Sequence, residues 1–125
     1  MPKTHKNFTL QELKDAIIEG AQEKKAKDIV ALNLIEIENS TSDYYVVCHG
    51  QSDRQAKSIA KSIEETVFNK LGVWPSHSEG YENSEWILLD YFDMVAHIFV
   101  EKHREFFAIE ELWADAPIEE FETIN

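Results

Sequence analysis

The sequence predicts an α/β fold in which a mixed β-sheet of about five strands is flanked by helices. Segments with apolar residues at helical spacing alternate with short runs of β-branched and aromatic residues, and the predicted order is α-β-β-α-β-β-β-α. The length of 125 residues suits a single domain with one buried core. We expect one domain over residues 1–125, folded at about 10–115, with a short N-terminal arm and an acidic C-terminal tail.

Two long helices are predicted from their caps and their apolar stripes. Each begins with a capping box, Thr9 with Glu12 in the first helix and Ser52 with Gln55 in the second. Apolar residues then recur every three to four positions, and Gly72 is a suitable residue to end the second helix. The two helices are expected over residues 9–26 and 52–71.

The five predicted strands are rich in β-branched and aromatic residues and are separated by turn or helix signals. Pro75 lacks a backbone donor, which places the third strand at an edge of the sheet. Only Phe92 and Asp93 separate the last two strands, which predicts a tight hairpin. The strands are expected at residues 28–34, 44–48, 73–79, 86–91 and 94–100.

The chain is expected to end in one further helix and a frayed tail. A helix over residues 103–113 would pack Phe106, Ile109, Leu112 and Trp113 against the sheet, and Pro117 lies beyond its end. Residues 115–125 carry many carboxylates, so we expect them to be frayed.

The net charge of −12, from 24 acidic and 12 basic residues, restricts the possible partners. Ten of the twelve lysines and arginines lie at or before Lys70, and residues 71–101 contain none. Broad binding to nucleic acid and docking on an anionic membrane both need clustered positive charge, so both are disfavoured. The charge instead favours a basic protein as partner.

Other features of the composition favour a cytoplasmic protein. No apolar run approaches the roughly 20 residues that cross a bilayer. The single cysteine, Cys48, excludes an intramolecular disulfide framework. The first ten residues lack the pattern of a secretory signal.

Few residues could perform catalysis or bind a metal. Cys48 and His49 are adjacent in a strand and so point to opposite faces, which favours a structural cysteine. Asp90 and His97 are expected to lie opposite each other on the two strands of the hairpin. We interpret them as a pair that supports the structure or contributes to an interface. The five histidines lack metal-site spacing. The turn at residues 50–52 is not followed by the Asp-x-Asp that metal-dependent nucleotidyl transfer needs. We expect no cofactor and no metal.

Residues 79–86 (EGYENSEW) place two aromatic and three acidic side chains before a strand. Two interpretations remain open for this segment. Trp86 is buried beneath a solvated acidic loop, or the segment is a protein-binding surface with aromatic anchors inside an acidic rim.

Seven short segments occur in an order that is informative as a set. They are residues 42–50 (SDYYVVCHG), 52–55 (SDRQ), 79–81 (EGY), 86–90 (WILLD), 95–99 (VAHIF), 104–106 (REF) and 112–113 (LW). This series resembles the ribosomal silencing factor family, also called the Iojap-like family, over about residues 10–115.

The resemblance implies an α/β domain related in fold to nucleotidyltransferases but without their catalytic carboxylates, and a homodimer in solution. It implies binding to the large ribosomal subunit through the basic ribosomal protein uL-fourteen. The bound factor would sterically block joining of the small subunit and so repress translation when nutrients are scarce. No enzymatic activity is implied.

On this resemblance we predict a partner-binding surface around the hairpin. Trp86 is expected to be an apolar anchor or a support beneath the surface, and Asp90 and Asp93 are expected to pair with Arg or Lys of the partner. The full set is Glu79, Tyr81, Trp86, Asp90, Phe92, Asp93, Met94 and His97.

Phe92 departs from the family pattern, which has a small residue, commonly glycine, at the hairpin tip. A two-residue primed turn places this residue at positive φ, which phenylalanine disfavours. Either the loop is longer, which changes the register of Asp90 and His97, or Phe92 is held at the tip as an exposed anchor.

Two other functions are kept as alternatives. One is a nucleotide-binding transferase that uses Ser52, Asp43 and Asp90. The other is an assembly factor that binds the same ribosomal protein during maturation of the large subunit.

Overall fold

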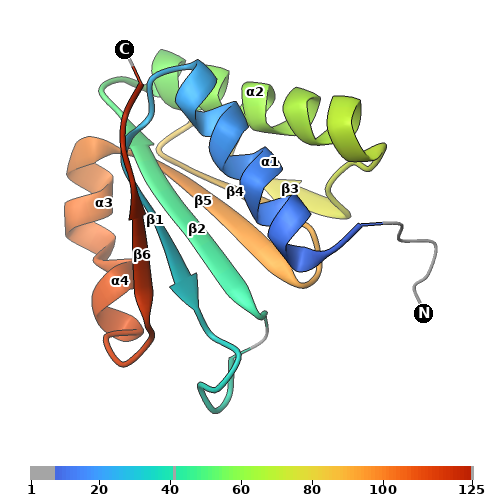
Figure 1. Ribbon diagram of the computed structural model, residues 1–125. Coiled ribbons are helices and arrows are strands. Elements are labelled where there is room, and N and C mark those ends of the chain that lie inside the picture. The colour runs from blue at the N-terminus through green and yellow to red at the C-terminus, as the bar shows by residue number, and fades with distance from the viewer. Residues whose placement is uncertain (1–7, 41, 125) are drawn as a thin grey trace.

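The computed structural model describes residues 8–40 and 42–124, which form a six-stranded mixed sheet with helices on both faces (Figure 1). The helices are α1 (Leu10–Glu23), α2 (Asp53–Leu71), α3 (Glu101–Phe107) and α4 (Ile109–Leu112). The strands are β1 (Lys27–Asn33), β2 (Tyr44–Gly50), β3 (His77–Glu79), β4 (Trp86–Asp90), β5 (Met94–Val100) and β6 (Ile118–Phe121). Within these ranges, no helix is both long and apolar enough to span a bilayer.

The strand order is β3-β4-β5-β2-β1-β6, with β2 and β5 parallel and every other neighbouring pair antiparallel. The predicted mixed sheet is therefore confirmed. The third strand lies at an edge, as Pro75 predicted, but it is shorter than expected. It covers only His77–Glu79, because Trp74 and Pro75 precede the paired segment.

The two long helices cover one face of the sheet. Thr9 and Glu12 form the predicted capping box. The predicted box at Ser52 forms only in part: Ser52 Oγ accepts the Gln55 N–H, but Gln55 Oε1 accepts the N–H of Gln51 instead of that of Ser52. Gly20 lets α1 approach α2, since a Cβ there would lie 2.7 Å from the Ile63 Cα. The apolar stripes of both helices pack on alternate residues of β1, β2, β4 and β5 and form the larger core cluster. A smaller cluster lies on the opposite face, under α3 and α4.

The single helix predicted for residues 103–113 is wrong. Ala108 has φ 48° and ψ 45°, in the left-handed region, and separates α3 from α4. The break at Ala108 turns Glu110 back towards Arg104, and the Arg104 guanidinium donates to the Glu110 carboxylate at 2.8 and 3.1 Å. The same break buries the Ile109 side chain. The ion pair between Arg104 and Glu110 and the burial of Ile109 therefore stabilise the left-handed conformation of Ala108.

The frayed C-terminal tail is also wrong, because residues 118–121 form β6 against β1. Phe121 pairs with Ile29 and packs against the larger core. Glu119 accepts a 2.8 Å hydrogen bond from Lys14 of α1. These long-range contacts hold a segment whose acidic composition by itself suggested disorder.

Residues 91–93 connect β4 and β5, and the Tyr91 N–H donates to the Met94 carbonyl at 2.8 Å, so that Phe92 and Asp93 form the tip as predicted. Phe92 has φ 72° at the tip, and its side chain is 64% exposed. Asp90 Oδ1 accepts the Phe92 N–H at 2.8 Å, and the Phe92 carbonyl accepts the Ser42 hydroxyl at 3.2 Å. These hydrogen bonds on both sides of the tip hold phenylalanine in a conformation that usually suits glycine.

Candidate functional site

The β3–β4–β5 end of the sheet is only partly covered on the face opposite α1 and α2. Along β4, Trp86, Leu88 and Asp90 are half-buried, whereas Ile87 and Leu89 between them are fully buried on the other face. The strand register brings neighbouring side chains to the same uncovered face. We call it the open face: Tyr45, His77, Glu79, Trp86, Leu88, Asp90, Val95 and His97.

Trp86 is held in place on the open face by its neighbours. Its Nε1–H donates to His97 Nδ1 at 3.0 Å, and its ring packs 5.0 Å from Phe99 and 4.8 Å from Phe107. The Tyr45 ring meets His97 edge-on at 4.4 Å. An indole fixed by stacking and a hydrogen bond is preorganised for contact with a partner.

His97 is a neutral histidine in this arrangement. Its Nδ1 accepts the tryptophan proton, so Nε2 carries the ring proton, and Nε2 is buried without a hydrogen-bond partner among the described residues. Burial lowers the pKa of His97 to about 4.

We predict that the protein loses stability in mild acid because of this histidine. A His whose folded pKa is lowered from 6.5 to about 4 binds its proton more readily when unfolded, so stability falls as pH drops from about 7 towards 4. The expected loss between pH 8 and pH 5 is about 2 kcal/mol. His49, whose pKa is lowered by burial and then by Arg104, acts in the same direction.

Urea unfolding across this pH range measures the effect. His97→Gln keeps an oxygen to accept the Trp86 N–H but cannot titrate there, so its stability should depend less on pH. Parallel stability profiles for the wild type and this variant would refute the assignment to His97.

Four of the eight predicted surface residues lie on the open face: Glu79, Trp86, Asp90 and His97. Phe92 and Asp93 form the hairpin tip beside it. The other two turn away. Met94 is fully buried in the core under α1 and α2, and the Tyr81 hydroxyl donates to Glu64 of α2.

The expected juxtaposition of Asp90 and His97 is wrong. Asp90 lies opposite Val95, and His97 lies opposite Leu88, so the two share a face but stand two positions apart along their strands. A two-residue loop makes Tyr91 and Met94 the closing pair, and this fixes the register. Asp90 supports the hairpin tip, and His97 supports Trp86.

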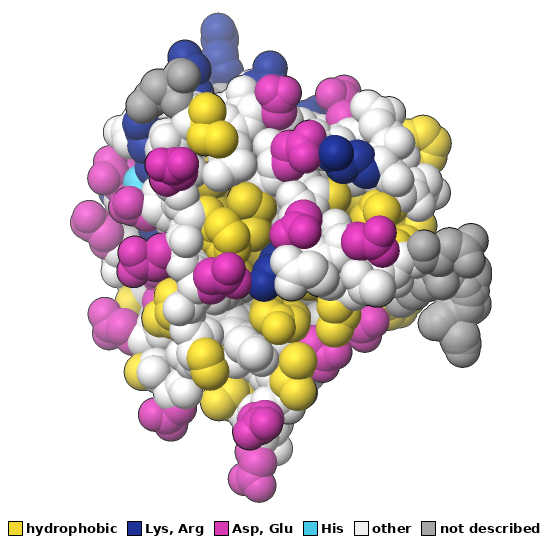
Figure 2. Space-filling model, viewed as in Figure 1, with side chains coloured by type: hydrophobic (Ala, Val, Ile, Leu, Met, Phe, Trp, Pro, Cys, Tyr) yellow, Lys and Arg dark blue, Asp and Glu magenta, His cyan; other side chains and the backbone are white. Residues whose placement is uncertain are grey.

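Sequence reasoning missed Tyr45 and Leu88, which provide half-buried apolar surface between the predicted polar residues, and Val95, which is buried beside them. The signal was present in β4, because strict alternation places residues 86, 88 and 90 on one face. The strands β2 to β5 contain no lysine or arginine, so the open face combines apolar side chains with the carboxylates of Glu79 and Asp90. Acidic side chains are also scattered over the face shown in Figure 2.

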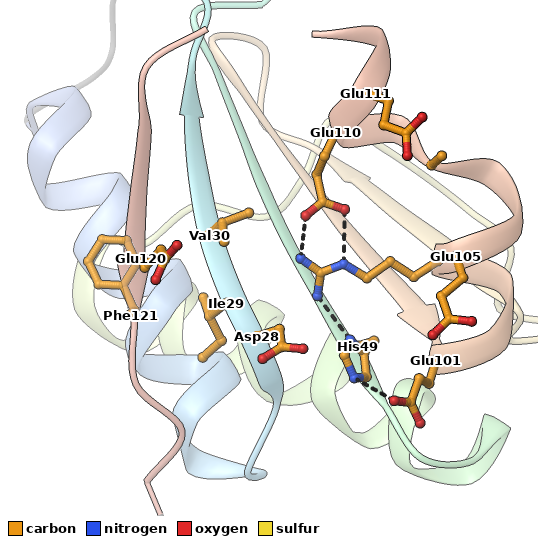
Figure 3. A pocket seen from close by; sticks show the side chains of 12 residues that line it. Asp28, Ile29, Val30, His49, Glu101, Glu105, Glu110, Glu111, Glu120 and Phe121 are labelled. Carbon is orange, nitrogen blue, oxygen red and sulfur yellow. Dashed lines mark hydrogen bonds and ion pairs between the residues drawn. The ribbon is translucent and has the colours of Figure 1, made fainter. Parts of the chain in front are cut away.

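A second feature is a cleft of about 590 Å³ between α3, α4, β1, β2 and β6. Figure 3 shows residues that line it, among them Glu110, His49 and Glu101, with Glu101 beside the His49 ring. Arg104 donates to both carboxylate oxygens of Glu110 and contacts His49 Nδ1 at 2.9 Å. This network attaches α3 and α4 to the sheet.

In the described part of the chain, the residues that were considered for catalysis or metal binding do not come together in one site. Cys48 lies in the core on the opposite face from His49, as predicted, and burial raises the pKa of its thiol to about 12. Asp43 precedes β2 and Ser52 follows it, so a strand of roughly 20 Å separates them. No group of three potential metal ligands occurs among the described residues.

Known proteins resemble this chain over most of its length. The family model described as "Ribosomal silencing factor during starvation" matches residues 7–125. A protein of Halalkalibacterium halodurans named ribosomal silencing factor RsfS is 36% identical over 114 residues, which cover 91% of this chain and 96% of the relative. A crystal structure of a Chromobacterium violaceum protein has a TM-score of 0.80 at 34% identity, covering 86% of this chain and 88% of that one.

A more distant relative bears on function through its name. The mouse (Mus musculus) protein called mitochondrial assembly of ribosomal large subunit protein 1 is 24% identical over 102 residues. The match covers 79% of this chain and 44% of the mouse protein.

Proposed function

The chain belongs to the ribosomal silencing factor family, and from this premise we propose that it binds the large ribosomal subunit through the basic ribosomal protein uL-fourteen. The bound protein blocks joining of the small subunit by its bulk and so represses translation under nutrient limitation. It acts in the cytoplasm, without catalysis and without a cofactor. The whole chain serves as one domain, with β6 as part of the sheet.

The open face is the observation that carries this proposal. It offers a fixed tryptophan, half-buried apolar side chains and carboxylates, and its strands supply no lysine or arginine. Such a surface repels ribosomal RNA but attracts a basic protein, and aromatic anchors are typical of the centre of protein interfaces. Asp90 and Asp93, at the hairpin end, are placed to meet basic side chains at its rim.

Sedimentation through sucrose gradients tests the proposal. Purified large and small subunits are mixed with and without the protein at several salt concentrations. We expect the protein to comigrate with the large subunit and whole ribosomes to decrease, with binding weakened as salt screens the charges. A protein that remains at the top of the gradient at low salt would refute the proposal.

We further propose that the free protein is a homodimer. The large apolar side chains that it exposes support self-association. Sedimentation velocity of the free protein would then give twice the chain mass of 14.5 kDa.

The name of the mouse relative supports a second candidate function, in assembly of the large subunit. The two functions use the same contact but differ in timing. Depletion of the protein would then leave precursors of the large subunit in gradients, whereas a pure joining block would leave mature subunits in normal amounts.

A further inference from the structure

Three large apolar side chains project from α3 and α4 into solvent. Phe106 is 79% exposed, Phe107 is 42% exposed and Leu112 is 75% exposed. We call these three residues the α3–α4 ridge. Their neighbours Arg104 and Ile109 point inward and are buried, so the left-handed residue Ala108 and the Arg104–Glu110 pair fix which side chains face out.

The ridge joins the open face at Trp86. The Phe107 ring lies 4.8 Å from Trp86, and the Phe106 ring meets Phe107 edge-on at 5.2 Å. An aromatic path therefore runs from the sheet onto α3 without a break. A partner that covers Trp86 also meets Phe107.

The charges around the ridge match those of the open face. Glu105 and Glu111 lie exposed in the same segment. Lys102 and Arg104 are the only lysine and arginine after Lys70, and Arg104 and Glu110 neutralise each other in an ion pair. A second copy of this chain would bring the same carboxylates against the ridge, so like charges would meet across a symmetric contact. A basic protein meets no such repulsion.

We propose that the α3–α4 ridge is the distal part of the surface that binds the basic ribosomal protein, an inference that rests on the function proposed above. Trp86 joins the two parts of the combined surface, since it belongs to the open face and its ring packs on Phe107 of the ridge. The ridge increases the apolar area that the complex buries and thereby lowers the dissociation rate.

The test compares Phe106→Ser and Leu112→Ser with a matched control, Phe68→Ser. Phe68 is 41% exposed on α2, which covers the opposite face of the sheet. Binding of the amino-terminally labelled protein to purified large subunits is followed by fluorescence anisotropy, and the mass of the free protein by sedimentation velocity. We expect about tenfold weaker binding for each ridge variant and less than twofold for the control.

Three other results would overturn the inference, each for a different reason. If the wild type does not bind large subunits, the proposed function fails and the ridge assignment fails with it. If the wild type binds and the ridge variants bind equally well, only the ridge assignment fails. If they bind equally well but no longer self-associate, a second copy occupies the ridge.

Discussion

Replacing Trp86 with alanine is expected to weaken binding to the large ribosomal subunit by about 30-fold or more, the effect of losing a central aromatic anchor. The indole packs on Phe99 and Phe107 and donates to His97, so truncation removes the contact surface and its support together. Equilibrium titration of labelled protein with purified large subunits measures the change.

Two further variants separate binding from folding. Trp86→Phe keeps an aromatic ring but leaves His97 Nδ1 without its donor, which costs about 1–3 kcal/mol of stability and less of binding. Trp74→Ala removes another tryptophan, 54% exposed and stacked on Phe68. It should bind normally. If Trp74→Ala and Trp86→Ala weaken binding alike, the open face is not the partner surface.

The sequence predicted the parts of the fold that are specified by neighbouring residues. The N-terminal caps at Thr9 and Ser52 and the alternation in β4 depend on positions one to four apart, so they can be recognised in a single chain. The edge position of β3 followed from Pro75 for the same reason.

What the sequence did not predict depends on contacts between distant residues. β6 forms because Phe121 meets Ile29 and Glu119 meets Lys14, about a hundred residues away. Ala108 has no local signal for a left-handed conformation, and only the Arg104–Glu110 pair and the burial of Ile109 account for it. Contacts remote in sequence therefore hold β6, and the Arg104 side chain that anchors the break at Ala108 is itself held by His49, 55 residues away.

In the candidate site, too, the sequence predicted the features that depend on neighbouring residues and missed others. Glu79, Trp86, Asp90 and His97 share a face because strand alternation and pairing place them there. Tyr81 and Met94 were also predicted for this surface, but the structure turns them towards α2 and the core. The ridge residues Phe106 and Leu112 were expected to pack against the sheet but are exposed, since the break at Ala108 was not foreseen.

Replacing Arg104 with leucine is expected to lower the free energy of unfolding by about 3–5 kcal/mol, the usual cost of removing one partner from a buried ion pair. Glu110 would lose two charge-assisted hydrogen bonds, and His49 Nδ1 would lose its neighbour at 2.9 Å. Urea unfolding measures the loss. Lys102→Leu, at an exposed position of the same helix, should change stability by less than about 1 kcal/mol.

A double variant distinguishes loss of the ion pair from loss of packing. Arg104→Leu combined with Glu110→Leu leaves no unpaired carboxylate, so it should recover most of the stability that Arg104→Leu loses. If the double variant is as unstable as the single one, the pair contributes little and the side-chain stem supplies the contact. Because Arg104 also orients α3 and α4, Arg104→Leu should weaken subunit binding through the ridge even where the protein remains folded, whereas Lys102→Leu should not.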